Sequence, residues 1–126
     1  MQCIMTVLLP RSVLELILHA SRSAYPNEFG ALIRGEGDKI KELLLLPGTV
    51  QGRRFASFRM DMLPLDSRAI GVVHSHPSGS NRPSEADLHM FSKRGNVNLI
   101  AKYPYQSVLD LAAYDSNGVE QEIEII

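Results

Sequence analysis

Cysteine is almost absent from this chain, which has one, Cys3, among its 126 residues. A single cysteine excludes a disulfide within the chain and favours an intracellular setting. No stretch approaches the ~20 consecutive apolar residues that a membrane-spanning helix needs. The N-terminus lacks the basic segment of a secretory signal, and Arg11 and Glu15 interrupt its apolar stretch. We therefore expect a cytoplasmic protein.

An excess of charge is also lacking, because 13 basic and 14 acidic side chains give a net charge of −1. Such a balance gives no general attraction to nucleic acid or to an anionic membrane. Repeats, linkers and low-complexity tracts are missing too. The composition is that of an ordinary globular protein, with 44% hydrophobic and 21% charged residues. A chain of this length can bury one core, so residues 1–126 are expected to form a single domain.

Two helices are expected. The first follows Pro10, with Ser12 and Glu15 as its capping box. Its apolar stripe leaves His19 on the solvated face and is expected to consist of Val13, Leu16, Ile17, Ala20 and Ala24. The second helix is expected from Ser84 to Lys93, with Leu88 and Phe91 in the core, and His89 turned away from Asp87.

Strands are expected wherever a short apolar run lies between turn residues. The runs 29–33 and 40–46 form a hairpin, and an Asn-Gly turn at 117–118 precedes a last strand whose mixed pattern suits a sheet edge. The full set of expected strands is 3–9, 29–33, 40–46, 69–73, 97–103, 108–114 and 119–126.

Two histidines stand at the end of the expected strand 69–73, in the sequence His74-Ser75-His76-Pro77. Side chains two residues apart on a strand lie on the same face, so both imidazoles would point to one place. Pro77 cannot donate a ladder hydrogen bond and ends the strand. A His-x-His pair is more often a polar strand end than a pair of ligands, so it does not define a metal site by itself.

A second feature begins seven residues after Pro77, in the sequence Ser84-Glu85-Ala86-Asp87. Ser84 is a typical N-cap residue, and Asp87 lies in the first turn of the helix that follows. The two residues have a purely structural interpretation as a capping box. Because Asp87 has two oxygens, it can also join the two imidazoles around a metal ion. Catalytic zinc commonly has three such ligands and water in its fourth position.

The order His74-Ser75-His76-Pro77, six further residues, Ser84, two more and Asp87 resembles the zinc signature of the JAMM (MPN+) metallopeptidases. That family also has an upstream glutamate, which corresponds to Glu28. The resemblance implies an α/β class and a single-domain MPN fold, similar to cytidine deaminase, with a mixed, curved β-sheet flanked by helices. It further implies one zinc ion per chain, with His74, His76 and Asp87 as its ligands.

The resemblance gives Glu28 and Ser84 catalytic roles in the hydrolysis of an amide. Glu28 would take a proton from water and pass it to the departing amine. Ser84 would donate a hydrogen bond to the developing oxyanion. By itself, a glutamate after Pro26-Asn27 is an ordinary surface-loop residue, although the apolar run that follows favours an interior position.

The substrates that the resemblance implies are small ubiquitin-like modifiers, which in prokaryotes double as sulfur carriers. One interpretation is a zinc isopeptidase that cleaves the bond between the C-terminus of the modifier and a lysine of a target protein. A second is a metallopeptidase that trims the C-terminus of a ubiquitin-like sulfur carrier. A third is a non-catalytic MPN scaffold, but such relatives lack parts of the signature that is complete here. A similar His-x-His stretch occurs in a bacterial family associated with DNA repair, but the lack of a basic excess gives no support to nucleic-acid binding.

Residues 49–68 are the least informative part of the sequence. Arg53, Arg54 and Arg59 alternate with Phe55 and Phe58, as in a half-exposed strand with a basic edge. Such charges usually face solvent. The resemblance implies an alternative, in which Arg53, Arg54 and Phe55 bind an extended substrate tail that pairs with this strand.

Overall fold

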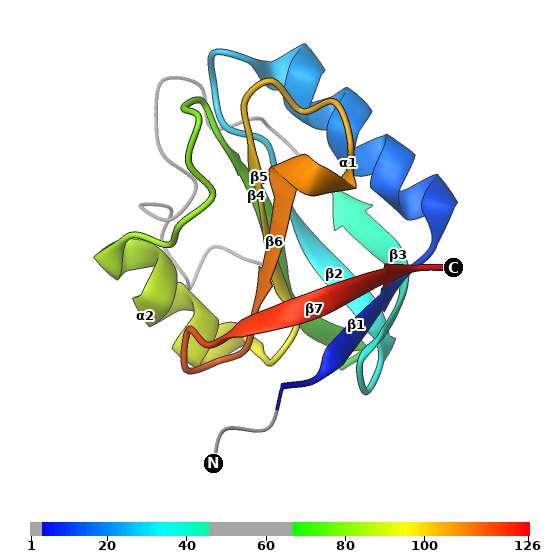
Figure 1. The fold of residues 1–126 in the computed structure, drawn as a ribbon. Helices are drawn as coiled ribbons and strands as arrows, with labels where there is room; N and C mark the ends of the chain where they lie inside the picture. Colours follow the sequence, from blue (N-terminus) through cyan, green and yellow to red (C-terminus); the bar gives the residue numbers. More distant parts are fainter. Residues whose placement is uncertain (1–3, 46–66) are drawn as a thin grey trace.

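The computed structural model describes residues 4–45 and 67–126 (Figure 1). These two ranges contain two α-helices, a short 3₁₀ turn and seven strands. In order these elements are β1 (Thr6–Leu9), α1 (Arg11–Ala24), β2 (Gly30–Glu36), β3 (Lys39–Leu45), β4 (Ala69–His76), α2 (Glu85–Arg94), β5 (Asn98–Lys102), η3 (Val108–Asp110), β6 (Leu111–Tyr114) and β7 (Glu120–Ile125).

The strands form one mixed sheet that closes on itself in the order β1-β3-β2-β4-β5-β6-β7. The β1–β3, β1–β7 and β4–β5 pairs are parallel, and the remaining pairs are antiparallel. The predicted hairpin is confirmed as β2–β3. The prediction that the last strand lies at an edge is wrong, because β7 pairs with β6 on one side and with β1 on the other. The ends of the chain meet there, and the contact closes the sheet.

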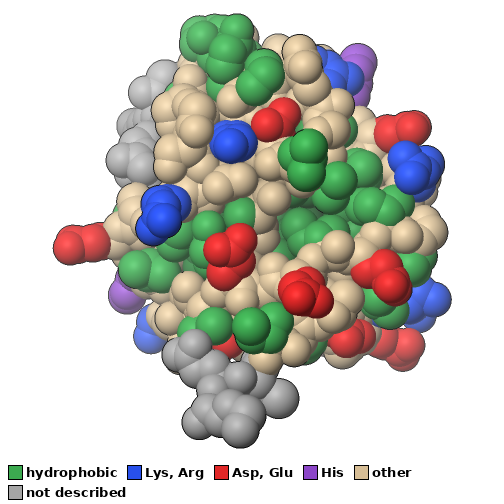
Figure 2. Space-filling view, in the orientation of Figure 1, with side chains coloured by type: hydrophobic (Ala, Val, Ile, Leu, Met, Phe, Trp, Pro, Cys, Tyr) green, Lys and Arg blue, Asp and Glu red, His purple; other side chains and the backbone are tan. Residues whose placement is uncertain are grey.

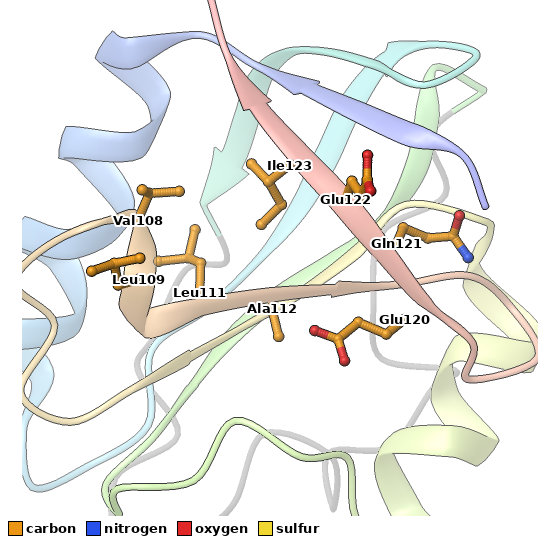
Figure 3. A pocket seen from close by; sticks show the side chains of 8 residues that line it. All are labelled: Val108, Leu109, Leu111, Ala112, Glu120, Gln121, Glu122 and Ile123. Atoms are coloured by element: carbon orange, nitrogen blue, oxygen red, sulfur yellow. The ribbon is translucent and has the colours of Figure 1, made fainter.

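The pairing between β6 and β7 is short. The two strands pair only at Ala113–Gln121 and Tyr114–Glu120 and then diverge. A hollow of about 470 Å³ opens where they part, with Leu111 and Ile123 on facing sides of the gap (Figure 3). Acidic side chains cross the face on which β7 lies, interspersed with hydrophobic patches (Figure 2), and the exposed ones on β7 are Glu120, Glu122 and Glu124. Negative charge on this face would repel a phosphate backbone.

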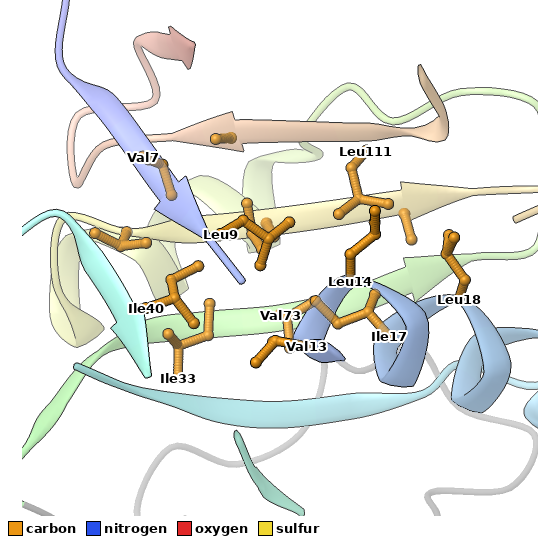
Figure 4. Close-up of a cluster of buried hydrophobic side chains, with 14 of the residues drawn as sticks. Val7, Leu9, Val13, Leu14, Ile17, Leu18, Ile33, Ile40, Val73 and Leu111 are labelled. Carbon is orange, nitrogen blue, oxygen red and sulfur yellow. The ribbon is translucent and has the colours of Figure 1, made fainter. Parts of the chain in front are cut away.

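The central strands are buried on both faces, and each face is covered by one helix. On β2, Ala31 and Ile33 belong to the larger core cluster, which α1 covers, whereas Leu32 belongs to the smaller cluster on the side of α2. Figure 4 shows the α1 side chains packed against those of the strands. The residues that α1 contributes are Val13, Leu14, Ile17 and Leu18, and those of α2 are Met90 and Phe91. The predicted class, a mixed curved sheet flanked by helices, is confirmed.

The start of α1 differs from the prediction. The helix begins at Arg11 with Pro10 as its N-cap and no side-chain cap, so the expected Ser12–Glu15 capping box is wrong. Proline is pre-set for the extended conformation that precedes a helix, and here it ends β1 and starts α1 in a single residue. The buried stripe is also shifted by one position, because Leu14 and Leu18 face the core while Leu16 is 40% exposed. His19 is exposed, as expected.

In α2, Phe91 is buried as predicted, but Leu88 is 38% exposed and Met90 takes the second core position. The helix ends at Gly95, whose φ of 136° suits glycine and whose missing side chain leaves room for the Ile70 carbonyl. The expected strand 108–114 opens with the 3₁₀ turn η3 and is strand only in β6. In the described ranges, no helix is long and apolar enough to cross a membrane.

Candidate metal centre

The end of β4 presents the two histidines. His74 and His76 are two positions apart, and both are buried, with exposures of 0% and 7%. β4 lies between β2 and β5, with His74 opposite Gly30 on one side and Ile100 on the other. As predicted, the two-residue period of the strand directs both imidazoles to one face of the sheet.

The start of α2 supplies the carboxylate. Ser84 is the N-cap, and it forms a capping box with Asp87, whose side chain accepts a hydrogen bond from the Ser84 amide. Asp87 is fully buried. The cap fixes the carboxylate in the first turn, so Asp87 faces the histidines instead of solvent.

The three side chains converge, with one ligand atom of each within 4.8 Å of the others. Each oxygen of Asp87 faces one imidazole: Oδ1 is 2.9 Å from His74 Nε2, and Oδ2 is 3.1 Å from His76 Nε2. Tetrahedral zinc with ligands at ~2.0–2.1 Å places neighbouring ligand atoms roughly 3.3 Å apart. The separations in this group are therefore close to those of zinc ligands.

Hydrogen bonding at His76 provides a test of whether a cation fits here. His76 Nδ1 lies 3.0 Å from the carbonyl oxygen of Ser80, which can only accept, so Nδ1 carries a proton. In neutral imidazole the other nitrogen then has a lone pair, and that lone pair faces the Asp87 carboxylate. Two acceptors at 3.1 Å require a positive charge between them, either a second proton or a metal ion. A backbone carbonyl that orients a histidine in this way is a common partner of metal ligands.

The shifts in acidity follow from the same contacts. Burial lowers the pKa of His76, but the hydrogen bond and the charge of Asp87 outweigh it, and the net pKa is raised. Burial raises the pKa of Asp87, but its bonds to His74 and His76 outweigh that effect and hold the pKa far below its ordinary value. Asp87 is therefore a carboxylate at any physiological pH, as a metal ligand must be.

Glu28 lies immediately before β2 and is 94% buried. Its neighbour Phe29 packs against the larger core cluster, on the other face of the sheet from the imidazoles. Alternation along the chain therefore supports an orientation of Glu28 toward the imidazole side. β2 pairs Gly30 with His74, and the Ser75 amide donates to the Phe29 carbonyl, so a continuation of this register would place Glu28 next to His76. The charge of Glu28 contributes to the raised pKa of His76, in agreement with this placement.

The remaining predicted residues have different outcomes. Ser84 is half-buried, and its Oγ accepts from the Asp87 amide over 3.1 Å, which leaves its hydroxyl proton available to a substrate. His89 is exposed, as expected. Arg53, Arg54 and Phe55 lie outside the described residues, so their role in substrate binding remains a prediction.

One residue beside the centre was missed. Tyr105 is 1% exposed, and its hydroxyl donates to the His76 carbonyl over 2.7 Å. The sequence places Tyr105 in the connection between the expected strands 97–103 and 108–114. No local pattern links it to a histidine 29 positions earlier.

The fold and this group of ligands define the class of protein, a JAB/MPN-type domain with a His-His-Asp zinc site. Residues 10–116 match the family described as prokaryotic homologs of the JAB domain. The chain therefore belongs to this family, which confirms the family and the zinc cofactor predicted from the signature.

Three individual proteins similar to this chain agree with this assignment to the family. A probable metalloprotease from Haloferax volcanii is 37% identical over 123 residues, which cover 90% of this chain and 75% of that protein. A solved structure described as a JAMM metalloprotease-like zinc site in the proteasome and signalosome has a TM-score of 0.75 at 35% identity, covering 97% of this chain and 99% of that one. A JAB1/MPN domain protein from Archaeoglobus fulgidus gives 0.74 at 38% identity, covering 95% and 98%.

Proposed function

We propose that the protein is a zinc-dependent isopeptidase that hydrolyses the amide between the C-terminus of a ubiquitin-like modifier and a lysine of a target protein. The observation that carries this proposal is the convergence of His74, His76 and Asp87 on one point. The contribution of the Glu28 charge to the raised pKa of His76 supports a place for Glu28 near this point. The similarity to proteins described as metalloprotease or metalloprotease-like supports the reaction class.

The proposal assigns a role to each residue. His74, His76 and Asp87 would hold the zinc ion, which when bound would supply an acidified water and a Lewis acid for the amide carbonyl. Glu28 accepts a proton from the attacking water and delivers it to the leaving amine. The Ser84 hydroxyl donates a hydrogen bond to the carbonyl oxygen as that atom becomes negative. The Ser80 carbonyl holds His76 in the tautomer that leaves Nε2 free to bind the metal.

Other uses of the same fold are less well supported. A scaffold without metal has no need of a buried carboxylate whose oxygens each face an imidazole. A buried carboxylate such as that of Asp87 is costly to retain unless it is paired or coordinates a metal ion. The alternative of trimming a sulfur-carrier protein uses the same residues and differs only in the leaving group. A comparison of substrates is therefore needed to distinguish the isopeptidase from the trimming enzyme.

The deciding experiment uses the zinc-loaded protein and two substrates with the same ubiquitin-like modifier. One carries a lysine isopeptide at its C-terminus, and the other carries a linear C-terminal extension. Chelator-sensitive cleavage of the isopeptide at a higher kcat/KM supports the isopeptidase, and preference for the linear extension favours trimming. One equivalent of zinc with no cleavage of either substrate would contradict both. The cytoplasmic location remains part of this proposal, and fractionation of cells would test it.

A further inference from the structure

The serine between the two histidines joins the end of β4 to the segment that carries Glu28. The Ser75 amide donates to the Phe29 carbonyl over 2.9 Å, and the Phe29 amide donates to Ser75 Oγ over 2.8 Å. A regular antiparallel pair would use the Ser75 carbonyl for the second bond. Here the side chain takes the place of the carbonyl, and Ser75 lies in register with Ala101 of β5 on the other side of β4. Ser75 thus holds Phe29, and with it Glu28, from the face opposite the imidazoles.

Tyr105 lies between Ser75 and His76, which is one of the predicted metal ligands. The phenol of Tyr105 donates to the His76 carbonyl over 2.7 Å. Burial raises the pKa of this phenol, and an interaction with the Ser75 side chain acts in the opposite direction, which places the two side chains beside each other. These contacts connect the Phe29 amide through Ser75 and Tyr105 to the backbone of His76. One end adjoins Glu28 and the other end is a predicted metal ligand.

Tyr105 is itself held in an unusual conformation. Its φ is +58°, in the left-handed region that non-glycine residues rarely adopt, and its side chain is 1% exposed. Arg22 of α1 donates to the Tyr105 carbonyl, and the Tyr105 amide donates to the Lys102 carbonyl over 3.0 Å. A backbone conformation that costs free energy persists only where the surroundings fix it, and such residues gather at functional sites.

We propose that Tyr105, acting through Ser75, is a positioning residue that sets the distance between Glu28 and His76. The inference rests on the proposed function, in which Glu28 transfers the proton. Neither Tyr105 nor Ser75 touches the substrate in this proposal. Proton transfer needs the donor and acceptor within about 2.6–3.2 Å of each other. A displacement of about 1 Å by a change outside the reacting groups can cost ~10²-fold in rate.

The test is Tyr105→Phe, which removes only the hydroxyl from this chain of contacts. The matched control is Tyr103→Phe, because Tyr103 packs against Tyr105 with ring centroids 5.9 Å apart but is half-exposed. We expect kcat to fall ~10- to 100-fold in Tyr105→Phe, with KM within twofold of the wild type. Zinc stoichiometry and the visible spectrum of the cobalt-substituted protein should stay unchanged. Tyr103→Phe should match the wild type in every measurement.

Ser75→Ala removes the middle of the same chain, and it should lower kcat by a similar factor. The double variant should be no slower than the worse single variant, because both changes break one linkage. If Tyr105→Phe folds poorly, Ser75→Ala still provides the test. Unchanged kcat in both single variants would overturn the proposal. Equal loss of zinc binding and of kcat would also overturn it, because the residues would then only maintain the metal ligands.

Amide hydrogen exchange separates this inference from the proposed function. The Phe29 amide should exchange at least ~10-fold faster in Tyr105→Phe than in Tyr103→Phe if this chain of contacts holds that segment. This readout requires no substrate, so it tests the linkage even if the wild-type protein cleaves no isopeptide. Unchanged protection of Phe29 would contradict the linkage, whatever the protein hydrolyses.

Discussion

Ser84 and Asp87 hold each other by two hydrogen bonds: the Ser84 amide donates to Asp87 Oδ2 over 2.8 Å, and the Asp87 amide donates to Ser84 Oγ over 3.1 Å. The same Asp87 oxygen lies 3.1 Å from His76 Nε2. The capping box and the ligand set are therefore one structure. The cap orients the carboxylate, and the carboxylate links the start of α2 to the end of β4.

The two roles of Ser84 can be separated by a pair of substitutions. Ser84→Ala should cost about 1 kcal/mol in the free energy of unfolding, whereas Ser84→Gly should cost only a few tenths, because glycine is tolerated at an N-cap. Both variants lack the hydroxyl, so kcat should fall ~10²–10³-fold in both. Denaturant unfolding and steady-state kinetics measure the two effects. A normal kcat in either variant would mean that Ser84 is only a cap.

Glu28→Gln should bind zinc as the wild type does and lose nearly all activity. Glutamine has the shape of glutamate but cannot accept the proton at neutral pH, and Glu28 is outside the group of three metal ligands. The measurements are metal content and kcat with an isopeptide substrate. Glu15→Gln is the control, because Glu15 is exposed on α1. Retained activity in Glu28→Gln would show that another group acts as the base.

Zinc should stabilise the folded protein. Free zinc at 100 times its dissociation constant should raise the free energy of unfolding by about 2.7 kcal/mol, because the ligands converge only in the folded state. Removal of zinc by a chelator should lower the melting temperature, and zinc should restore it. His76→Ala should lose this response, while His89→Ala, on the exposed face of α2, should keep it. A response that survives in His76→Ala would place the metal elsewhere.

Alkaline pH should destabilise the fold through Tyr105. Burial raises the pKa of its phenol from 10.0 to about 12. The contribution of Tyr105 is therefore complete below pH 10 and is lost as the pH rises toward 12, because the unfolded chain releases this proton first. The loss should reach about 2 kcal/mol by pH 12. Urea unfolding at pH 9, 10, 11 and 12 should show a shallower decline in Tyr105→Phe, and an equal decline in both proteins would mean that the phenol ionises as it does in the unfolded chain.

The sequence determined the features that depend on short-range geometry. A period of two residues puts His74 and His76 on one face of a strand wherever that strand lies. Ser84 and Asp87 are three residues apart, and their capping box forms within one turn of helix. These local rules were sufficient to select three candidate ligands, and the resemblance to the zinc signature predicted the family. They failed at the start of α1, where Pro10 occupies the N-cap position expected of Ser12 and no side chain caps the helix.

Tertiary structure decided the features that depend on strand pairing. The register that sets Gly30 opposite His74, and on which the proposed place of Glu28 depends, joins segments more than 40 residues apart. The closure of the sheet by β1 and β7 joins the two ends of the chain, and a strand that looks like an edge in the sequence becomes internal. Tyr105 reaches His76 only because β4 and β5 are parallel neighbours, and the loop after β5 then returns to the end of β4. Pairing of this kind is fixed by the packing of the whole core, which no short segment of sequence encodes.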